Sequence, residues 1–263
     1  MIYIDKYAYI SKLKHQDPIY KLVFCMMTLG VCLWANSIII SIIALLIMGW
    51  HTVCKGGIPC AIFMKLMIIP MSFLAIGVLT VGINVSDKKD IFLFYISVFD
   101  INAGVTQSGI QNAAHLFFKA LGAVSCLYYL SLNTPMVDIL QALGRLRVPK
   151  LFIELMSLIY RFIFVLLETV EMMLTAQKSR MGYSGISSGY RSLAALASTL
   201  FIRAYKRSDE LYTSLEARGY DGELNALHES YKKGWIQYTS PITVNLILIA
   251  MTLIIRHFTG GLM

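Results

Sequence analysis

Charged residues are scarce in this sequence. Only 14% of the 263 residues are Asp, Glu, Lys or Arg, whereas 57% are hydrophobic and the mean hydropathy is +0.66. Soluble domains carry about 25% charged residues, so the composition excludes an ordinary soluble protein. A backbone in lipid must satisfy its hydrogen bonds within a helix or a closed barrel, and the apolar runs here are continuous instead of alternating. The sequence therefore predicts an all-α polytopic membrane protein.

Motifs for catalysis and cofactor binding are also lacking. No Gly-x-x-x-x-Gly-Lys-Ser/Thr phosphate-binding loop occurs, and the five cysteines form no Cys-x-x-Cys pair. The histidines are spread over five segments, so their spacing predicts no metal site. We expect a non-catalytic chain that binds no cofactor and no metal of its own.

The net charge of +8 does not indicate nucleic-acid binding. Basic residues flank the apolar runs, as the positive-inside rule requires, and do not interleave with aromatic residues as on an RNA-binding surface. The segment 132–241 is rich in Lys and Arg, so we expect it on the cytoplasmic side, with the N-terminus inside and the C-terminus outside. Three regions follow: a membrane region 1–132 of about four spans, a cytoplasmic region 133–233, and a final membrane span within 234–263.

Five apolar runs predict membrane-spanning helices, at 19–34, 38–50, 62–82, 113–132 and 241–258. The first two are shorter than the roughly 20 residues that a span prefers. We expect them to form a tight hairpin of short spans, with one long tilted helix as the alternative. Residues 91–99 are apolar and aromatic but too short to span, and we expect them to lie in the membrane interface.

The polar region predicts three helices. Thr134 and Pro135 should begin the first, and Pro149 should end it. The second, 151–178, carries a polar stripe within an arc of about 120°. The stripe consists of Glu154, Ser157, Arg161, Glu168, Glu171, Thr175 and Lys178. A lipid-facing helix would not keep such a stripe, so we favour a helix against the cytoplasmic side of the membrane body, with a buried span carrying one paired polar seam as the alternative. A turn at 187–189 and a third helix at 191–216 should follow.

One short motif occurs twice. Residues 179–185 read Ser-Arg-Met-Gly-Tyr-Ser-Gly, and residues 217–222 read Ala-Arg-Gly-Tyr-Asp-Gly. Each copy closes a long helical pattern with an arginine and then breaks it with glycine. One such arginine would simply complement the helix dipole. Two copies favour docking to a paired partner with acidic grooves, because the guanidinium fork suits carboxylates and carbonyls.

These features resemble the transmembrane T component of an energy-coupling factor (ECF) transporter, of the cobalt subgroup called CbiQ. The resemblance covers almost the whole chain. It rests on Thr134-Pro135, Arg147-Val148-Pro149, Ser179-Arg180-Met181 and Ala217-Arg218-Gly219, and on the opening Ile4-Asp5-Lys6-Tyr7-Ala8. The first arginine signature departs from the commoner Ala-Arg-Gly by its flanking Ser179 and Met181.

The resemblance implies partners and a mechanism. Two ABC ATPase subunits would hydrolyse ATP and dock at Ser179, Arg180, Met181, Ala217, Arg218 and Gly219. A membrane S component of the metal-binding type would hold the substrate, together with a small accessory membrane subunit, in a prokaryotic cell membrane. Cobalt is the expected substrate, with nickel or a vitamin as alternatives. A polytopic membrane enzyme using Arg161, Glu168 and Glu171, and a self-sufficient channel, are the alternatives from other classes.

Overall fold

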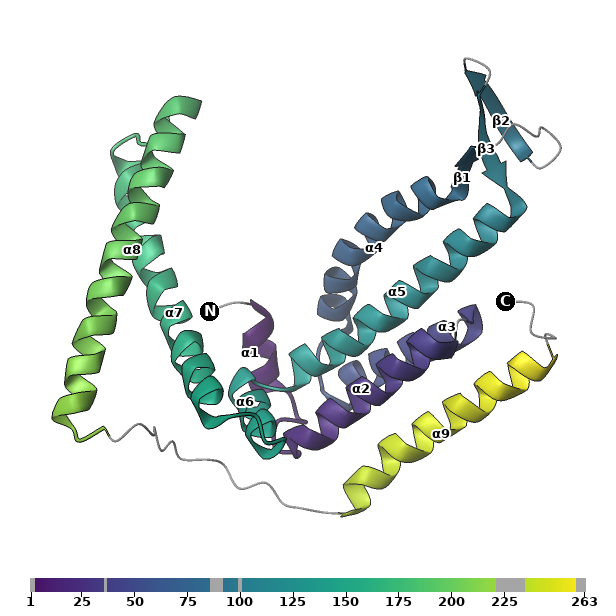
Figure 1. Cartoon of the computed structure of the whole chain (residues 1–263), viewed down its shortest axis with the longest axis horizontal. Helices are drawn as coiled ribbons and strands as arrows, with labels where there is room; N and C mark the ends of the chain where they lie inside the picture. The colour runs from purple at the N-terminus through teal and green to yellow at the C-terminus, as the bar shows by residue number, and fades with distance from the viewer. Residues whose placement is uncertain (1–2, 36, 86–91, 99–100, 221–234, 259–263) are drawn as a thin grey trace. The chain divides into compact units, whose positions relative to one another are not determined.

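The computed structural model describes residues 3–35, 37–85, 92–98, 101–220 and 235–258 (Figure 1). The chain forms two compact units. One comprises Ile2–Ile139 together with Ser230–Met263, and the other comprises Leu140–Glu229. The first is called the membrane unit below, and the second the hairpin unit.

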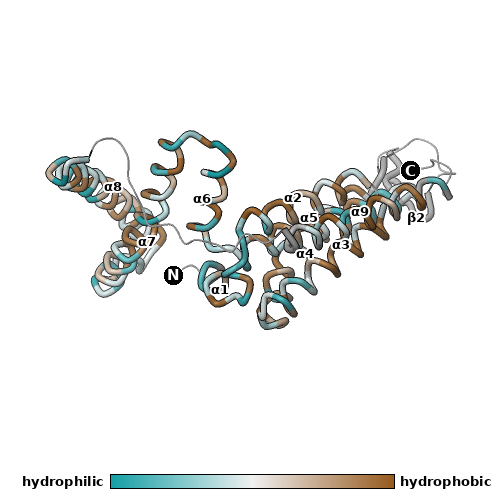
Figure 2. The backbone as a smooth tube through the Cα atoms, turned by 90° about the horizontal axis from the view of Figure 1, so that it is seen from below, coloured by the Kyte–Doolittle hydropathy of each residue, from teal (hydrophilic) through white to brown (hydrophobic). Residues whose placement is uncertain are grey.

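The membrane unit is a bundle built around one central helix. Its helices are α1 (Tyr3–Ile10), α2 (Pro18–Ala35), α3 (Ile38–Trp50), α4 (Cys60–Gly82), α5 (Gln107–Asn133) and α9 (Trp235–Phe258), and α3 continues into a π-helical turn, η1 (His51–Lys55). α5 packs against α1, α2, α3 and α4, whereas α9 packs mainly on α2. Apolar residues predominate along α2, α3 and α9 (Figure 2).

Four described helical segments are long and apolar enough to cross a membrane, at Pro18–Ala35, Ile38–Lys55, Cys60–Gly82 and Gly109–Asn133. A shorter apolar stretch, Pro241–Ile255, lies in α9, which begins six residues before the predicted start and continues through Pro241. The expectation of an all-α polytopic membrane protein is confirmed. α2 and α3 are separate helices that contact each other, so the two short spans predicted there are also confirmed and the single tilted helix is excluded.

The interfacial position of residues 91–99 stays a prediction, and the structure gives the secondary structure of most of this run. Phe92–Val98 forms a strand, β2, in a small antiparallel sheet with β1 (Ile83–Val85) and β3 (Ile101–Thr106), in the order β1-β3-β2. The register pairs Tyr95 with Gly104 and Ile83 with Val105. Aromatic and β-branched residues favour strands, and the chain supplies a partner strand immediately downstream. The sheet joins α4 to α5. The predicted polar loop at 87–90 lies outside the described residues.

Close packing of small and aromatic side chains holds the bundle together. Phe24 and Tyr129 are buried and meet edge-on with their ring centroids 5.5 Å apart. Gly122 of α5 allows α2 and α3 to approach, since a Cβ there would lie 2.9 Å from Cys32 Sγ and 3.0 Å from the carbonyl oxygen of Ser41. In lipid, where helix association depends on packing, such small residues let backbones approach closely.

The remaining helices are α6 (Met136–Arg145), which crosses the boundary between the two units, α7 (Lys150–Ser179) and α8 (Ile186–Ala217). The three helices predicted in the polar region are thus confirmed, with two corrections. Residues 187–189 lie inside α8, and the turn comes earlier because Gly185, with extended dihedrals, precedes the helix. The hydroxyl of Thr134 makes no hydrogen bond within the described chain, so Thr134 does not cap α6 through its side chain.

Candidate functional site: two arginine-tipped helix ends

Arg180 and Arg218 occupy the same structural position. Arg180 is the C-cap of α7, with φ −95° and ψ 16°, and Arg218 is the C-cap of α8, with φ −94° and ψ 8°. Both side chains are exposed, and within the described chain neither takes part in a hydrogen bond or ion pair. Each helix therefore presents an exposed guanidinium group at its C-terminus, where the helix dipole is negative.

The backbone after each arginine closes in the same way. After Arg180, the N–H of Met181 donates to the carbonyl of Lys178 at 3.0 Å, and the N–H of Gly182 donates to that of Gln177 at 2.9 Å. This pair of bonds is the Schellman motif, which satisfies carbonyls at a helix end.

The second end repeats this pattern bond for bond. Gly219 N–H donates to the Glu216 carbonyl and Tyr220 N–H to the Leu215 carbonyl, both at 3.0 Å. The sequence duplication therefore encodes a duplicated helix terminus, down to its backbone hydrogen bonds.

The residue after each arginine has a left-handed backbone. Gly219 has φ 76°, a conformation that glycine adopts freely. Met181 has φ 57°, which is uncommon for a residue with a side chain. The departure of the first copy from Ala-Arg-Gly thus leaves the fold of the signature intact. Met181 is 70% exposed, so its side chain extends the tip beside Arg180.

A hydrogen-bonded brace fixes the first tip. The amide of Gln177 donates to the carbonyl of Ser192 at 2.9 Å and accepts from the hydroxyl of Tyr183 at 2.8 Å. The hydroxyls of Ser188 and Ser192 both donate to the carbonyl of Gly182, at 2.9 and 2.8 Å. A Cβ on Gly182 would stand 2.7 Å from Ser192 Oγ, so glycine is required for this contact. The brace holds Arg180 in place relative to the start of α8.

Sequence reasoning missed Gln177, Ser188 and Ser192 as supporting residues. These side chains act across the turn between two helices, and hydropathy patterns contain no information on such contacts. The tyrosine in each Gly-Tyr-x-Gly copy was the available signal, because Tyr183 bonds to Gln177.

The two tips lie far apart. Arg180 precedes α8 and Arg218 ends it, and the 32 residues of α8 extend about 48 Å. α7 and α8 run antiparallel, so Arg180 and Arg218 stand at opposite ends of the hairpin (Figure 1). The two arginines therefore do not line a single binding pocket.

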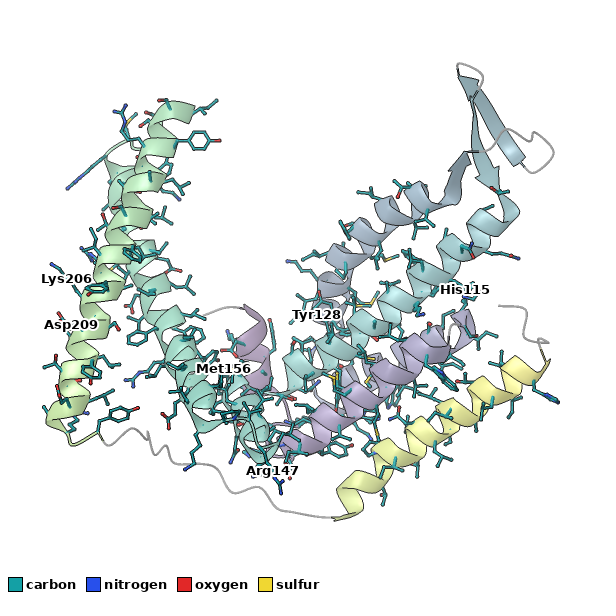
Figure 3. The ribbon with its side chains drawn as sticks, in the orientation of Figure 1. His115, Tyr128, Arg147, Met156, Lys206 and Asp209 are labelled. Carbon is teal, nitrogen blue, oxygen red and sulfur yellow. The ribbon has the colours of Figure 1, made fainter. Side chains whose placement is uncertain are left out.

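The polar stripe of α7 faces solvent. Arg161, Glu168 and Glu171 are exposed and Glu154 is half-buried, and no residue of α7 is buried. Within the described chain, Arg161 and Glu168 do not pair with each other, so the residues form no catalytic constellation there. Polar side chains on α8, including Lys206 and Asp209, are also exposed (Figure 3).

Large apolar side chains are exposed on both hairpin helices. On α7 these are Leu151, Phe152, Leu155, Ile159, Ile163, Leu167 and Met172, and on α8 they are Ile186, Tyr190, Leu193, Phe201, Ile202, Tyr205 and Tyr212. The apolar side chains of α8 differ in exposure, since Leu200, Ala204, Leu211 and Leu215 are partly covered, whereas Leu193 and Phe201 remain open. An apolar surface of this extent marks an interaction site.

The histidines that the structure describes do not converge. His51 packs against Tyr129, with ring centroids 6.2 Å apart. His115 lies fourteen positions earlier on α5, which places it about 21 Å along the helix. Within the described residues, no three His, Cys, Asp or Glu side chains are grouped so that they could hold a metal ion.

Known proteins resemble this chain over nearly its full length. A family model described as CbiQ, cobalt transport protein, matches residues 11–228. An uncharacterized protein of Methanocaldococcus jannaschii is 33% identical over 97% of this chain and 94% of its own length. The cobalt transport protein CbiQ of Salmonella typhimurium is 30% identical over 84% of this chain and 98% of its own length.

The likeness extends to the wider transporter class. The energy-coupling factor transporter transmembrane protein EcfT of Staphylococcus aureus is 25% identical over 98% of this chain and 97% of its own length. The matched region includes α2 to α5 of the bundle and both arginine-tipped ends. The chain belongs to the CbiQ family of cobalt transport proteins, the cobalt-type transmembrane T components of energy-coupling factor transporters.

Proposed function

We propose that this chain couples ATP hydrolysis by two partner ABC ATPase subunits to substrate release from a membrane S component. The observation that carries the proposal is the repeated helix-end geometry at Arg180 and Arg218, on two exposed tips at opposite ends of α8. An ATPase pair offers two equivalent grooves, and each tip supplies one cation with a fixed backbone. When the ATPases close on ATP, the two tips move together and α7 and α8 transmit the motion.

The exposed apolar side chains of the hairpin unit support the second half of the coupling. A membrane S component presents an apolar surface, and Leu193 and Phe201, 57% and 73% exposed, offer a matching one. The substrate, cobalt, would be held by the S component, and this chain would bind neither cobalt nor ATP. The small accessory membrane subunit belongs to the same assembly.

The ATPase proposal is tested by replacing both arginines. We expect Arg180→Ala/Arg218→Ala to lose co-purification of co-expressed ABC ATPase subunits, because each docking point loses the guanidinium group at its helix C-cap. The matched control is Arg203→Ala/Arg207→Ala, which removes two exposed arginines from the middle of α8. The control should retain the ATPases, and both variants should be inserted in the membrane at wild-type levels. Retention of the ATPases by the Arg180/Arg218 double variant at the wild-type ratio would refute the docking role.

The orientation of the chain is part of the proposal. Both tips must face the ATPases in the cytoplasm, which places the N-terminus inside, and the Lys and Arg content of 132–241 supports this by the positive-inside rule. On a cysteine-free background, Ser188→Cys should be protected from a membrane-impermeant thiol reagent in intact cells and labelled after permeabilisation. Labelling in intact cells would reverse the orientation.

A further inference from the structure

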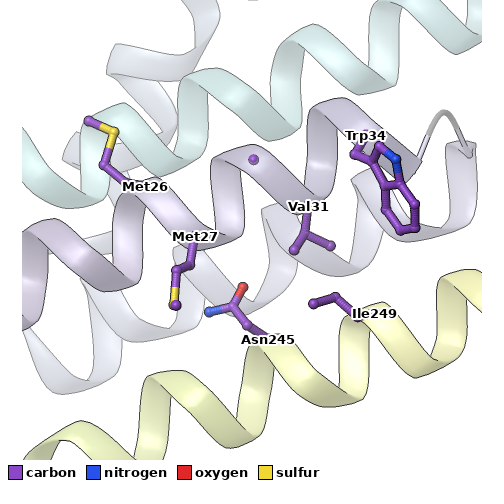
Figure 4. Close-up of a pocket in the computed structure, with 7 residues that line it drawn as sticks. Met26, Met27, Val31, Trp34, Asn245 and Ile249 are labelled. Carbon is purple, nitrogen blue, oxygen red and sulfur yellow. The ribbon is translucent and has the colours of Figure 1, made fainter.

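A groove runs between α2 and α9 in the membrane unit (Figure 4). Its volume is about 430 Å³, and its lining residues are Met26, Met27, Gly30, Val31, Trp34, Asn245 and Ile249. The lining contains no ionisable side chain. At Gly30 the groove is open, since within the described chain no atom beyond the adjoining residues and backbone of α2 lies within 4 Å of the position that a Cβ would take.

Asn245 has the only side-chain amide in this lining, and only the nitrogen of that amide has a hydrogen-bond partner. The side chain is 4% exposed, and its Nδ2 donates to the carbonyl of Pro241 at 2.8 Å. Within the described chain its Oδ1 has no hydrogen-bond partner. Figure 4 shows the side chain rising from α9 toward α2, between Met27 and Ile249.

Three buried threonines of the bundle find an acceptor within their own helices. The hydroxyls of Thr28, Thr52 and Thr252 each donate to the carbonyl four residues earlier in their own helix. An amide oxygen cannot do this, because it is an acceptor and the N–H groups inside a helix are already engaged. Asn245 Oδ1 therefore needs a donor from outside the two helices.

The position along the helices restricts where the donor comes from. Asn245 lies ten residues, about 15 Å, after the start of α9, and Gly30 lies twelve residues, about 18 Å, after the start of α2. The hydrocarbon core is about 30 Å thick, so the groove lies at the depth of the acyl chains. Acyl chains carry no hydrogen-bond donor, and an unsatisfied polar group there is costly.

We propose that this groove seats one transmembrane helix of a partner membrane subunit, which places a small residue against Gly30 and donates a side-chain hydrogen bond to Asn245 Oδ1. The donor is Ser, Thr, Asn or Gln, the residues that bond across membrane helices, and the small residue allows the backbones to approach. The inference rests on the proposed function only in that the chain works with a membrane partner. It concerns the bilayer face of the membrane unit and is independent of the arginine tips.

Site-specific photocrosslinking in the native membrane tests the inference. A benzophenone amino acid replaces Trp34, which borders the groove and is 54% exposed. The control probe replaces Phe73 on α4, which is 76% exposed and outside the groove. We expect mass spectrometry to find the Trp34 adduct on a transmembrane segment of another subunit that contains Ser, Thr, Asn or Gln. The Phe73 probe should react mainly with lipid.

A second substitution links the adduct to Asn245. Asn245→Leu keeps a similar volume but removes the acceptor, and we expect it to lower the Trp34 crosslinking yield about 3- to 30-fold, the range for one interhelical hydrogen bond in a membrane. Lipid-only adducts at Trp34, adducts to a second copy of this chain, or an unchanged yield with Asn245→Leu would each overturn the inference. Co-purification of the ATPases, measured on the same samples, reports separately on the proposed function.

Discussion

Met181 has a backbone conformation that favours glycine, yet it lies beside Arg180, the arginine of the first repeated helix end. A left-handed residue with a side chain costs about 1–2 kcal/mol relative to a right-handed one. Gly219 occupies the equivalent place in the second copy without that cost. The first tip therefore retains a strained residue whose side chain is 70% exposed, and this pattern is typical of a residue kept for contact with a partner.

Met181→Gly should stabilise the protein. Relief of the left-handed conformation outweighs the added entropy of glycine in the unfolded chain, about 0.4–1 kcal/mol, so we expect a net gain of about 0.5–1 kcal/mol. Thermal unfolding in detergent, followed by circular dichroism, measures it. Gly219→Ala is the reciprocal control and should lose about 1 kcal/mol. Equal midpoints for all three proteins would mean that the left-handed conformation does not contribute to stability.

At the scale of the elements, a buried lysine ties the N-terminal segment to the end of α5. Lys21, in the first turn of α2, is fully buried, and its Nζ donates to the carbonyl of Leu13 at 3.1 Å and to that of Asn133 at 3.0 Å. Asn133 ends α5, so its carbonyl has no partner within the helix, and a cation there complements the dipole. Ser11 adds a third tie, since its hydroxyl donates to Asn133 Oδ1 at 2.8 Å.

Lys21→Met should destabilise the membrane unit by about 3 kcal/mol. Methionine has a similar length but leaves two carbonyls without their charge-assisted donor, each worth about 1.5–3 kcal/mol before relaxation. The control is Lys65→Met on α4, where the lysine is exposed and little change is expected. Denaturant titration in detergent measures both variants. A Lys21→Met protein as stable as the Lys65→Met protein would show that the buried ammonium gains nothing from its two carbonyl partners.

The elements could be predicted to very different degrees. The ends of α7 and α8 could be found because an arginine with a glycine one or two residues later marks a helix terminus in the sequence itself. β2 was missed because its apolar run gives no period, and its pairing depends on a partner strand, β3, that shows no hydropathy signal. The burial of Lys21 could not be predicted, because it depends on carbonyls of residues 13 and 133, a contact that no local pattern specifies.

At the scale of the whole molecule, the two units differ in the side chains that they expose. The helices of the membrane unit expose apolar side chains outward, as α9 does with Leu246, Ile247 and Leu253, and keep Asn245 and Thr252 on the inner side. α7 and α8 instead carry charged side chains along their whole lengths and end in the two arginines. Under the proposed function, a chain built in this way transmits motion between partners, and another subunit selects the substrate.

Cobalt selection should therefore be independent of this chain's histidines. Cobalt sites favour several imidazole or thiolate ligands that converge from fixed elements. The ring of His51 packs against those of Phe24 and Tyr129, with its centroid 5.1 Å from that of Phe24. His51 therefore contributes to the packing of the bundle. We expect cobalt uptake by the assembled transporter to survive His51→Ala at reduced stability, and to survive His115→Ala and His228→Ala with little change; His228 lies outside the described residues.

Calorimetry on the purified chain gives the decisive measurement. Without its partners, the chain should bind cobalt only weakly and without a defined stoichiometry, and a His115→Ala/His228→Ala variant should give the same isotherm. Partner membrane subunits purified in the same detergent serve as the positive control, because the proposed function places the ion on them. One equivalent of cobalt bound to the isolated chain with submicromolar affinity would place the substrate site here, and the chain would then be a metal-binding subunit as well as a coupling one.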